Sequence, residues 1–235
     1  MHRLPVLGGP IRGASLAVPS LTRASFAVGT YQSHITQAMR SHVRRGDVTY
    51  DLGAHVGYFT LVLARLVGPD GHVYSFEPDP RNFEALTANT AHADQVTPVA
   101  AAVSDQPGEV VFATFELSSI GHIADSNTPG DARRLPVRCT TLDSFVYEEG
   151  NPPPAFLKID VEGAETLVLQ GAARLLREAR PTIVVEVRGP GRWNEVKEIA
   201  EAAGYEPSMI GAGERGLGSA GYGDALLVPA RRARQ

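Results

Sequence analysis

The sequence lacks the features typical of disulfide-bonded, membrane-spanning and nucleic-acid-binding proteins. A single cysteine, Cys139, in 235 residues excludes a disulfide framework and a cysteine-based zinc site. No apolar run approaches the roughly 20 residues that span a bilayer. The net charge is −4, without the basic excess expected of a nucleic-acid binder. We therefore expect a cytoplasmic protein whose partner is a small molecule, not a nucleic acid or a membrane. The sequence leaves open whether the protein forms a homo-oligomer.

The rest of the composition is that of a globular domain. Apolar residues make up 43% and charged residues 20%, which suits one α/β domain of up to roughly 250 residues. Residues 1–46 differ, because they hold six arginines and no acidic residue. An organelle transit peptide can begin in this way, but glycine and proline breaks favour an N-terminal arm leading into a helix near 31–43. We expect this arm and helix over 1–46 and one domain over 47–230.

From residue 47, strand-like runs alternate with helical stretches. Strands are predicted over 48–52, 72–76, 96–103, 155–161 and 182–187, and helices over 57–67, 79–91, 163–177 and 193–203. This alternation is typical of a parallel sheet with right-handed crossovers. Gly171 could kink or split its helix. Two late strands, 205–210 and 225–228, are joined by a glycine-rich stretch, and we expect them to pair antiparallel.

The alternation is interrupted between about residues 104 and 142. Strand-like runs at 109–115 and 135–140 flank a polar loop over 116–134. This strand-rich insertion follows the third strand at the edge where ligands bind in α/β sheets, so we expect it to help wall a substrate site. Just beyond it, Asp143 is expected to cap a helix.

A glycine-containing turn follows the first strand of the domain and reads Asp51-Leu52-Gly53-Ala54-His55-Val56-Gly57. Glycines at such a turn let the backbone approach a ligand. The spacing D-x-G-x-x-x-G differs from the dinucleotide fingerprint G-x-G-x-x-G. A carboxylate here suits a sulfonium or amino group better than a pyrophosphate, which favours S-adenosylmethionine over NAD. An ordinary tight turn is the simpler alternative.

Acidic residues also follow two other strands. Glu77 could accept hydrogen bonds from a ribose diol, or it could be a surface residue beside a helix cap. Asp160 shares a strand face with Lys158, and charges in a buried strand are costly unless they are paired or functional. Glu162 and Glu165 lie near the start of the next helix, where capping is the simpler explanation for Glu165.

Three residues near the ligand-binding edge of the sheet are candidate bases. Asp160 lies at the carboxyl end of a central strand, and we favour it as the residue that orients or deprotonates the substrate. His122, in the polar loop, is the second candidate, although an exposed histidine often has no role. Glu186 ends another strand at the same edge and could instead pair with an arginine. Carboxylates here could bind Mg²⁺ through oxygen, but we see no dedicated cage and expect no metal.

Taken in order, these motifs resemble the FkbM family of S-adenosylmethionine-dependent methyltransferases. The matching segments are DLGAHVGYFT (51–60), SFEPDPRNFEAL (75–86), AAVSDQPGEV (101–110), TTLDSF (140–145), FLKIDVEGAETLVLQGA (156–172) and RPTIVVEV (180–187). The resemblance implies the Rossmann-like class I methyltransferase fold, an α/β fold with a mostly parallel seven-stranded sheet and a terminal antiparallel hairpin. It also implies O-methylation of a natural product, sugar or glycolipid, with S-adenosyl-L-methionine as cofactor.

The resemblance further implies which residues bind the cofactor. Asp51, Gly53 and Gly57 would shape its methionine end and Glu77 would hold its ribose, whereas His55 stands where the family commonly has asparagine. The full expected set is Asp51, Gly53, His55, Gly57, Tyr58, Glu77, Pro78, Ser104 and Asp160. The alternatives are a non-catalytic cofactor-binding protein of the same fold and an NAD-dependent oxidoreductase. The retained acidic residues argue against the first, and the absent dinucleotide fingerprint argues against the second.

Overall fold

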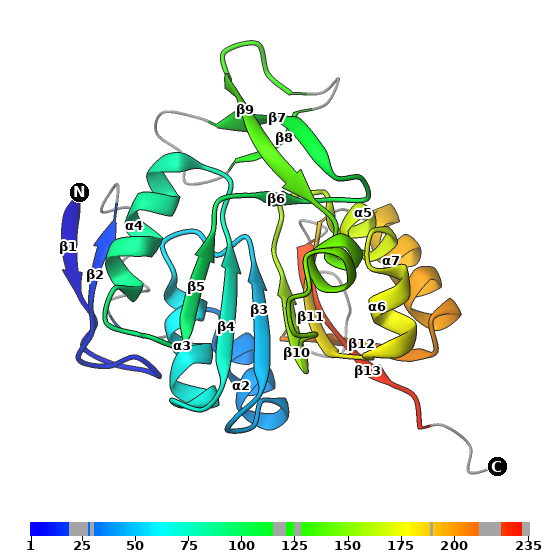
Figure 1. The fold of residues 1–235 in the computed structure, drawn as a ribbon, viewed down its shortest axis with the longest axis horizontal. Helices are drawn as coiled ribbons and strands as arrows, with labels where there is room; N and C mark the ends of the chain where they lie inside the picture. Colours follow the sequence, from blue (N-terminus) through cyan, green and yellow to red (C-terminus); the bar gives the residue numbers. More distant parts are fainter. Residues whose placement is uncertain are drawn as a thin grey trace.

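The computed structural model describes residues 1–18, 28, 31–114, 121–124, 128–188, 190–211 and 222–231. Its central sheet contains seven strands: β3 (Val48–Leu52), β4 (His72–Phe76), β5 (Val96–Val99), β10 (Phe156–Ile159), β11 (Thr182–Arg188), β12 (Tyr205–Ile210) and β13 (Tyr222–Pro229). Their order is β12-β13-β11-β10-β3-β4-β5 (Figure 1). β13 runs antiparallel to both neighbours, and the remaining pairs are parallel. The predicted sheet and its terminal antiparallel pair are confirmed.

The central strands carry apolar residues on both faces of the sheet, and helices cover both faces. One apolar cluster contains residues of α2 (Ser33–His42), α3 (Tyr58–Val67) and α4 (Pro80–Thr90). The other contains residues of η1 (Ser144–Glu148), α5 (Glu165–Gln170), α6 (Ala173–Glu178) and α7 (Pro190–Ala202). Among the described residues, no helix is long and apolar enough to cross a membrane.

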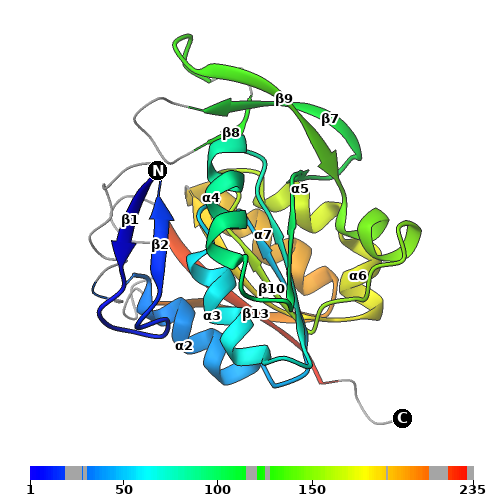
Figure 2. The ribbon, with the colours of Figure 1, turned by 60° about the vertical axis from the view of Figure 1, so that its left-hand side comes forward.

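The first 18 residues form an ordered hairpin, whereas the sequence predicted only an arm here. Strand β1 (His2–Pro5) pairs antiparallel with β2 (Ser15–Val18), beside α4 (Figure 2). The Asn89 amide on α4 accepts from the Ala17 backbone N–H at 2.6 Å and donates to the Ala17 carbonyl at 2.9 Å. It also donates to the Val56 carbonyl at 2.8 Å. One side chain therefore joins the hairpin to the turn before α3.

Two predicted elements are divided in the structure. The strand expected over 96–103 is two strands, because the chain turns at Ala101 and β6 (Ala102–Val103) joins a different sheet from β5. The helix expected over 163–177 is split into α5 and α6 at Gly171, where a Cβ atom would lie 2.2 Å from the Ser104 carbonyl oxygen. Asp143 caps α6 by accepting from the N–H groups of Arg174 and Leu175, both at 2.8 Å.

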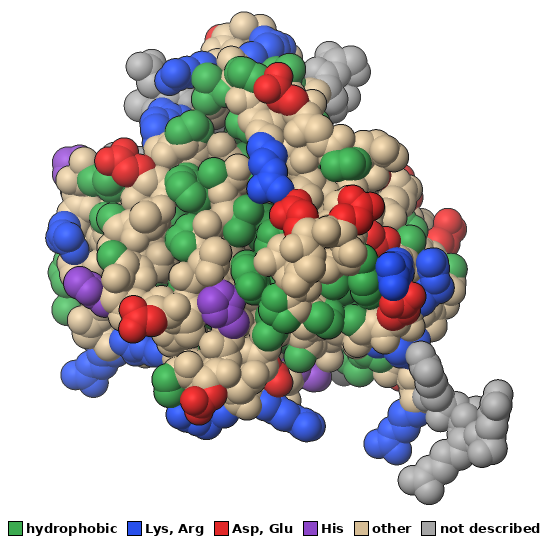
Figure 3. Space-filling view, in the orientation of Figure 1, with side chains coloured by type: hydrophobic (Ala, Val, Ile, Leu, Met, Phe, Trp, Pro, Cys, Tyr) green, Lys and Arg blue, Asp and Glu red, His purple; other side chains and the backbone are tan. Residues whose placement is uncertain are grey.

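A second sheet projects above the carboxyl edge of the central sheet (Figure 1). Its order is β6-β9-β7-β8, with β7 (Gly108–Thr114), β8 (His122–Ile123) and β9 (Arg133–Thr140). The two predicted strands are confirmed, but the region expected to be only a polar loop contains β8. Figure 3 shows basic side chains around this projection, and the arginines of β9 at 133, 134 and 138 are exposed.

Candidate cofactor and substrate site

A cavity lies at the carboxyl ends of the central strands. Its walls come from the sheet, from the segment before α2, from α3 and from the second sheet. The polar and charged lining residues include Gln32, His55, Glu77, Asn82, Lys158, Asp160, Glu162, Glu186 and Arg188. The apolar and aromatic lining residues include Tyr31, Tyr58, Phe59, Phe76, Pro78, Ala101, Ala102, Val103, Phe112, Ile123 and Val161.

The turn after β3 brings three strand ends into contact. Gly53 has φ +71°, and a Cβ atom there would lie 1.8 Å from the Asp160 carbonyl oxygen. Only glycine therefore lets the turn lie so close to the end of β10. The backbone N–H groups of Gly53 and Ala54 both donate to the Phe76 carbonyl at the end of β4, at 3.0 and 2.9 Å. The turn is fixed against both neighbouring strands.

Glu77 is held rigidly in the cavity wall. Its two carboxyl oxygens accept backbone N–H groups, one from His55 at 2.8 Å and one from Asp79 at 2.9 Å. Only 4% of the residue is exposed. Burial raises the pKa of Glu77 to about 7, although the two backbone hydrogen bonds oppose this shift. Each carboxyl oxygen has two lone pairs, so the group still has capacity to accept hydrogen bonds from a ligand.

Asp51 and Lys158 form a buried ion pair below the cavity. Asp51 Oδ1 lies 3.1 Å from Lys158 Nζ, and Asp51 Oδ2 accepts from the Thr60 hydroxyl at 2.7 Å. Burial lowers the pKa of Lys158, but the carboxylates of Asp51 and Asp160 more than compensate and raise it overall. Among the described residues, the positively charged group in contact with Asp51 is therefore that of Lys158. Direct contact between Asp51 and a bound cofactor stays a prediction.

Three acidic residues gather on the cavity wall beside an arginine. One carboxylate oxygen from each of Asp160, Glu162 and Glu186 lies within 4.8 Å of the other two. The Arg188 guanidinium lies 2.6 Å from Glu162, 2.5 Å from Glu186 and 3.7 Å from Asp160. Burial, followed by the charge and hydrogen bond of Asp160, raises the pKa of Glu186 to about 9, and Arg188 opposes this. The carboxyl groups of Glu186 and Asp160 also share a hydrogen bond.

These carboxyl groups could supply oxygen ligands to a divalent cation. Arg188 already contributes a positive charge to the group, however. The expectation that no metal is needed stays a prediction.

The structure separates the three candidate bases. Asp160 and Glu186 line the cavity, whereas His122 lies on the other side of its wall. In β8, Ile123 pairs with Phe112 and faces the cavity, so the alternation of strand side chains points His122 to the opposite face. The His122 Nε2 atom is 2.9 Å from the Thr128 hydroxyl. This placement favours Asp160 over His122 as the base.

The remaining expected cofactor residues differ in position. Tyr58 and Pro78 line the cavity. Gly57, with φ +88°, lets α3 start close to α4, because a Cβ atom there would lie 2.8 Å from Leu86 Cδ1. The Ser104 hydroxyl donates to Asp105 at 3.0 Å, beyond the lining residues 101–103. The cofactor roles of Gly57 and Ser104 are therefore less supported than those of Tyr58 and Pro78.

Arg188 is the main site residue that the sequence interpretation missed. It ends β11 two residues after Glu186, so the alternation of side chains along a strand places both on one face. The same reasoning had linked Lys158 with Asp160 and could have identified Arg188. No sequence pattern identifies Gln32 as a site residue, because it reaches the cavity from a left-handed turn before α2, with φ 40°.

Similarity to known proteins agrees with this geometry. The sequence model described as the methyltransferase FkbM domain matches residues 51–207, more than half of the chain. Hexuronic acid methyltransferase AglP of Haloferax volcanii is 25% identical over 206 residues, which cover 83% of each protein. The 31-O-demethyl-FK506 methyltransferase FkbM of Streptomyces tacrolimicus is 30% identical over 194 residues, covering 69% of this chain and 74% of that protein.

Solved structures of other proteins share the fold of this chain. Fibrillarin of Aeropyrum pernix, crystallised with natively bound S-adenosyl-L-methionine, superposes with a TM-score of 0.51 at 14% identity, covering 83% of this chain and 73% of that one. The predicted Rossmann-like class I methyltransferase fold is confirmed. The chain belongs to the FkbM family of methyltransferases.

Proposed function

We propose that this methyltransferase uses S-adenosylmethionine to methylate a hydroxyl group of a small, uncharged acceptor. The observation that carries the proposal is a cavity with the fixed carboxyl group of Glu77 at one strand end and Asp160 beside Glu186 at another. S-adenosylmethionine supplies a methyl group on a positively charged sulfonium. A hydroxyl oxygen can attack the carbon of that methyl group as the hydroxyl loses its proton.

The residues after β3, β4 and β5 suit this cofactor. Glu77, held by two backbone N–H groups, has lone pairs for the two hydroxyls of a ribose. The apolar lining residues 101–103 suit the faces of an adenine ring. Asp51 would act indirectly here, through the buried ion pair that anchors Lys158 beneath the turn.

Asp160 is the proposed base. A positioned base typically contributes 10²–10⁴-fold to a rate. Lys158 and Arg188 each lie 3.7 Å from one of its carboxyl oxygens, and Glu186 shares a hydrogen bond with it. Asp160 would accept the proton of the acceptor hydroxyl as the hydroxyl oxygen takes the methyl group; the bond between that methyl group and sulfur would break, and S-adenosylhomocysteine would leave.

The charges on the cavity wall favour an uncharged acceptor such as a sugar hydroxyl or a hydroxylated natural product. Arg188, the cation nearest the acidic group, is already within 2.6 Å of Glu162 and 2.5 Å of Glu186. A carboxylate or phosphate placed beside Asp160 would have to displace one of these partners, at a cost in desolvation and repulsion. A neutral hydroxyl can instead donate to Asp160 directly.

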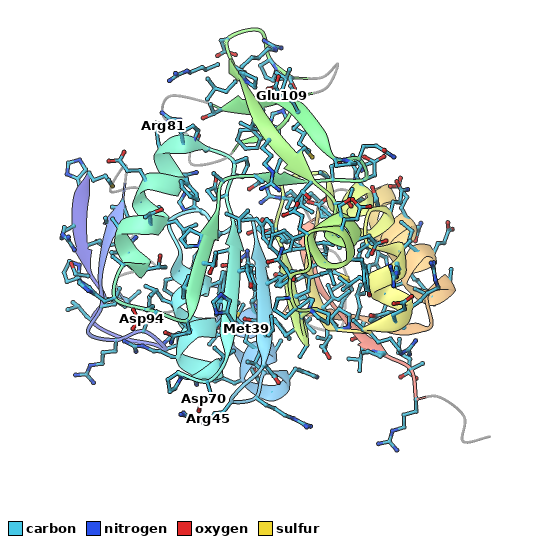
Figure 4. All side chains as sticks on the ribbon, viewed as in Figure 1. Met39, Arg45, Asp70, Arg81, Asp94 and Glu109 are labelled. Atoms are coloured by element: carbon cyan, nitrogen blue, oxygen red, sulfur yellow. The ribbon has the colours of Figure 1, made fainter. Side chains whose placement is uncertain are left out.

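Replacement of Asp160 tests the proposal. Asp160→Asn keeps the shape of the side chain but removes the base, so kcat should fall by at least ~10²-fold, with S-adenosylhomocysteine affinity largely kept. The measurement is formation of a product heavier by one methylene unit, from a panel of hydroxylated metabolites. Asp94→Asn, at an exposed position beyond α4 (Figure 4), is the matched control and should react at the wild-type rate.

Two results would change the assignment. Normal turnover by Asp160→Asn would show that the base is another group, and His122→Ala would then be examined. Loss of S-adenosylhomocysteine binding in Asp160→Asn would move Asp160 from the acceptor side to the cofactor side of the cavity.

A further inference from the structure

The second sheet contributes two apolar side chains to the cavity. Phe112 of β7 and Ile123 of β8 are register partners, and both line the cavity. Phe112 is only 6% exposed. It shares an apolar cluster with Ala102, which follows β5, and with Val137 and Cys139 of β9. These side chains are therefore held in place by the sheet that carries them.

The contacts of β7 show which end of the cavity it covers. Two residues beyond Phe112, Thr114 accepts a hydrogen bond of 2.6 Å from Arg81 in the first turn of α4. Arg81 lies close in sequence to the cavity residues Glu77 and Pro78. Phe112 is thus tied on one side to the segment after β4, through Thr114, and on the other to the segment after β5, through Ala102.

The acidic group lies elsewhere along the sheet. Asp160 follows β10, and the order β10-β3-β4-β5 places two strands between β10 and β5. Neighbouring strands are ≈ 4.7–4.9 Å apart, so the ends of β10 and β5 are separated by about 14 Å. The insertion consequently enters the cavity from the side opposite the proposed base.

We propose that Phe112 and Ile123 form the outer wall of an adenine subsite, opposite the apolar residues 101–103. This inference rests on the proposed use of S-adenosylmethionine. A flat aromatic base between apolar faces gains stacking and loses contact with water. The strand-rich insertion is then part of the cofactor site, in contrast to the expectation from sequence that it walls the substrate site.

The test compares two adjacent positions of β7. Phe112→Ala removes the wall, and Phe112→Leu keeps much of its apolar volume. Val111→Ala is the matched control, because Val111 is 48% exposed and pairs with Pro136 on the outer face of the sheet. Calorimetry measures the affinity for S-adenosylhomocysteine and for adenosine alone, and thermal melts verify folding.

In Phe112→Ala, both affinities should fall by at least about 10-fold, within the range for loss of one stacking partner. Phe112→Leu should lose less, and Val111→Ala should bind like the wild type. The KM for the acceptor at saturating S-adenosylmethionine should not change.

A different pattern would overturn the inference. Unchanged S-adenosylhomocysteine and adenosine affinity in Phe112→Ala, with a raised acceptor KM, would assign Phe112 to the acceptor side while leaving the cofactor proposal intact. If Phe112→Ala does not fold, the same comparison applies to Phe112→Leu and Ile123→Ala. Failure of the wild type to bind S-adenosylhomocysteine would instead refute the proposed function itself.

Discussion

The carboxyl group of Glu77 is almost completely buried, and its protonation is coupled to folding. Burial raises its pKa from 4.5 to about 7 in the folded chain. Between these two values the folded chain keeps a proton that the unfolded chain releases. The free energy of unfolding must then fall as the pH rises through this window, by up to about 1.4 kcal/mol per pH unit.

Glu77→Gln should remove this dependence, because glutamine does not titrate. We expect the stability difference between variant and wild type to shift in favour of the variant from pH 5 to pH 7, as measured by urea unfolding at both values. The variant loses one backbone hydrogen bond at both pH values, so only the change with pH is informative. Glu84→Gln, exposed on α4, is the control. Identical pH dependence in wild type and Glu77→Gln would contradict the raised pKa.

The acidic residues of the site could be predicted from sequence, whereas their pairing could not. Carboxyl ends of parallel strands meet at one edge of a sheet, which predicts that Asp51, Glu77 and Asp160 lie near one another. The sequence links Lys158 with Asp160 on its own strand, and the two groups do lie 3.7 Å apart. The closer partner of Lys158 is Asp51, at 3.1 Å, because the register places it directly opposite on β3, and this depends on how two distant segments align.

At the scale of the elements, two side chains hold the N-terminal hairpin: Asn89, and Arg65 of α3, which donates to the carbonyls of Pro10 and Arg12. Asn89→Ala would remove both hydrogen bonds to Ala17 and the bond to Val56. A part-buried backbone group left without a partner typically costs ≈ 1–3 kcal/mol. We expect a stability loss of that size and faster hydrogen exchange at residues 2–18, with the exchange of the central sheet little altered.

Thr87→Ala is the control for this prediction, because Thr87 bonds only within α4, to the Phe83 carbonyl, at an exposed position. Hydrogen exchange of the hairpin that stays as slow in Asn89→Ala as in the wild type would show that apolar packing around Ile11 and Leu16 and the hydrogen bonds from Arg65 are enough to hold it.

Elements with local signals could be predicted, and those defined by distant partners could not. Asp79 caps α4 by accepting from the Arg81 N–H, as the Asp-Pro pair indicates. In contrast, residues 96–103 form one apolar run, and nothing within it reveals that β6 pairs with β9. Strands β1 and β2 were missed for the same reason, since four-residue strands give little periodicity and their support lies on α4.

At the scale of the whole molecule, a ligand that binds only the folded chain must raise its stability. At 100 times its dissociation constant a ligand contributes ≈ 2.7 kcal/mol. For a chain of this size each kcal/mol is worth ≈ 2–4 °C, so S-adenosylhomocysteine should raise Tm by about 5–11 °C in a thermal melt. NAD at the same concentration should produce no shift, because the turn after β3 lacks the G-x-G-x-x-G spacing that brings backbone N–H groups to a pyrophosphate. Equal shifts with both ligands would contradict the assigned cofactor.

The contact between Ala17 and Asn89 has a consequence for synthesis on the ribosome. The two residues are 72 positions apart in the chain. At about 5–20 residues per second, roughly 4–14 seconds pass between the translation of one and the translation of the other. Throughout that interval the hairpin lacks α4, the helix beside β2. The hairpin is thus translated before the helix that fixes it, and its hydrogen bonds to Asn89 can form only after α4 has been made.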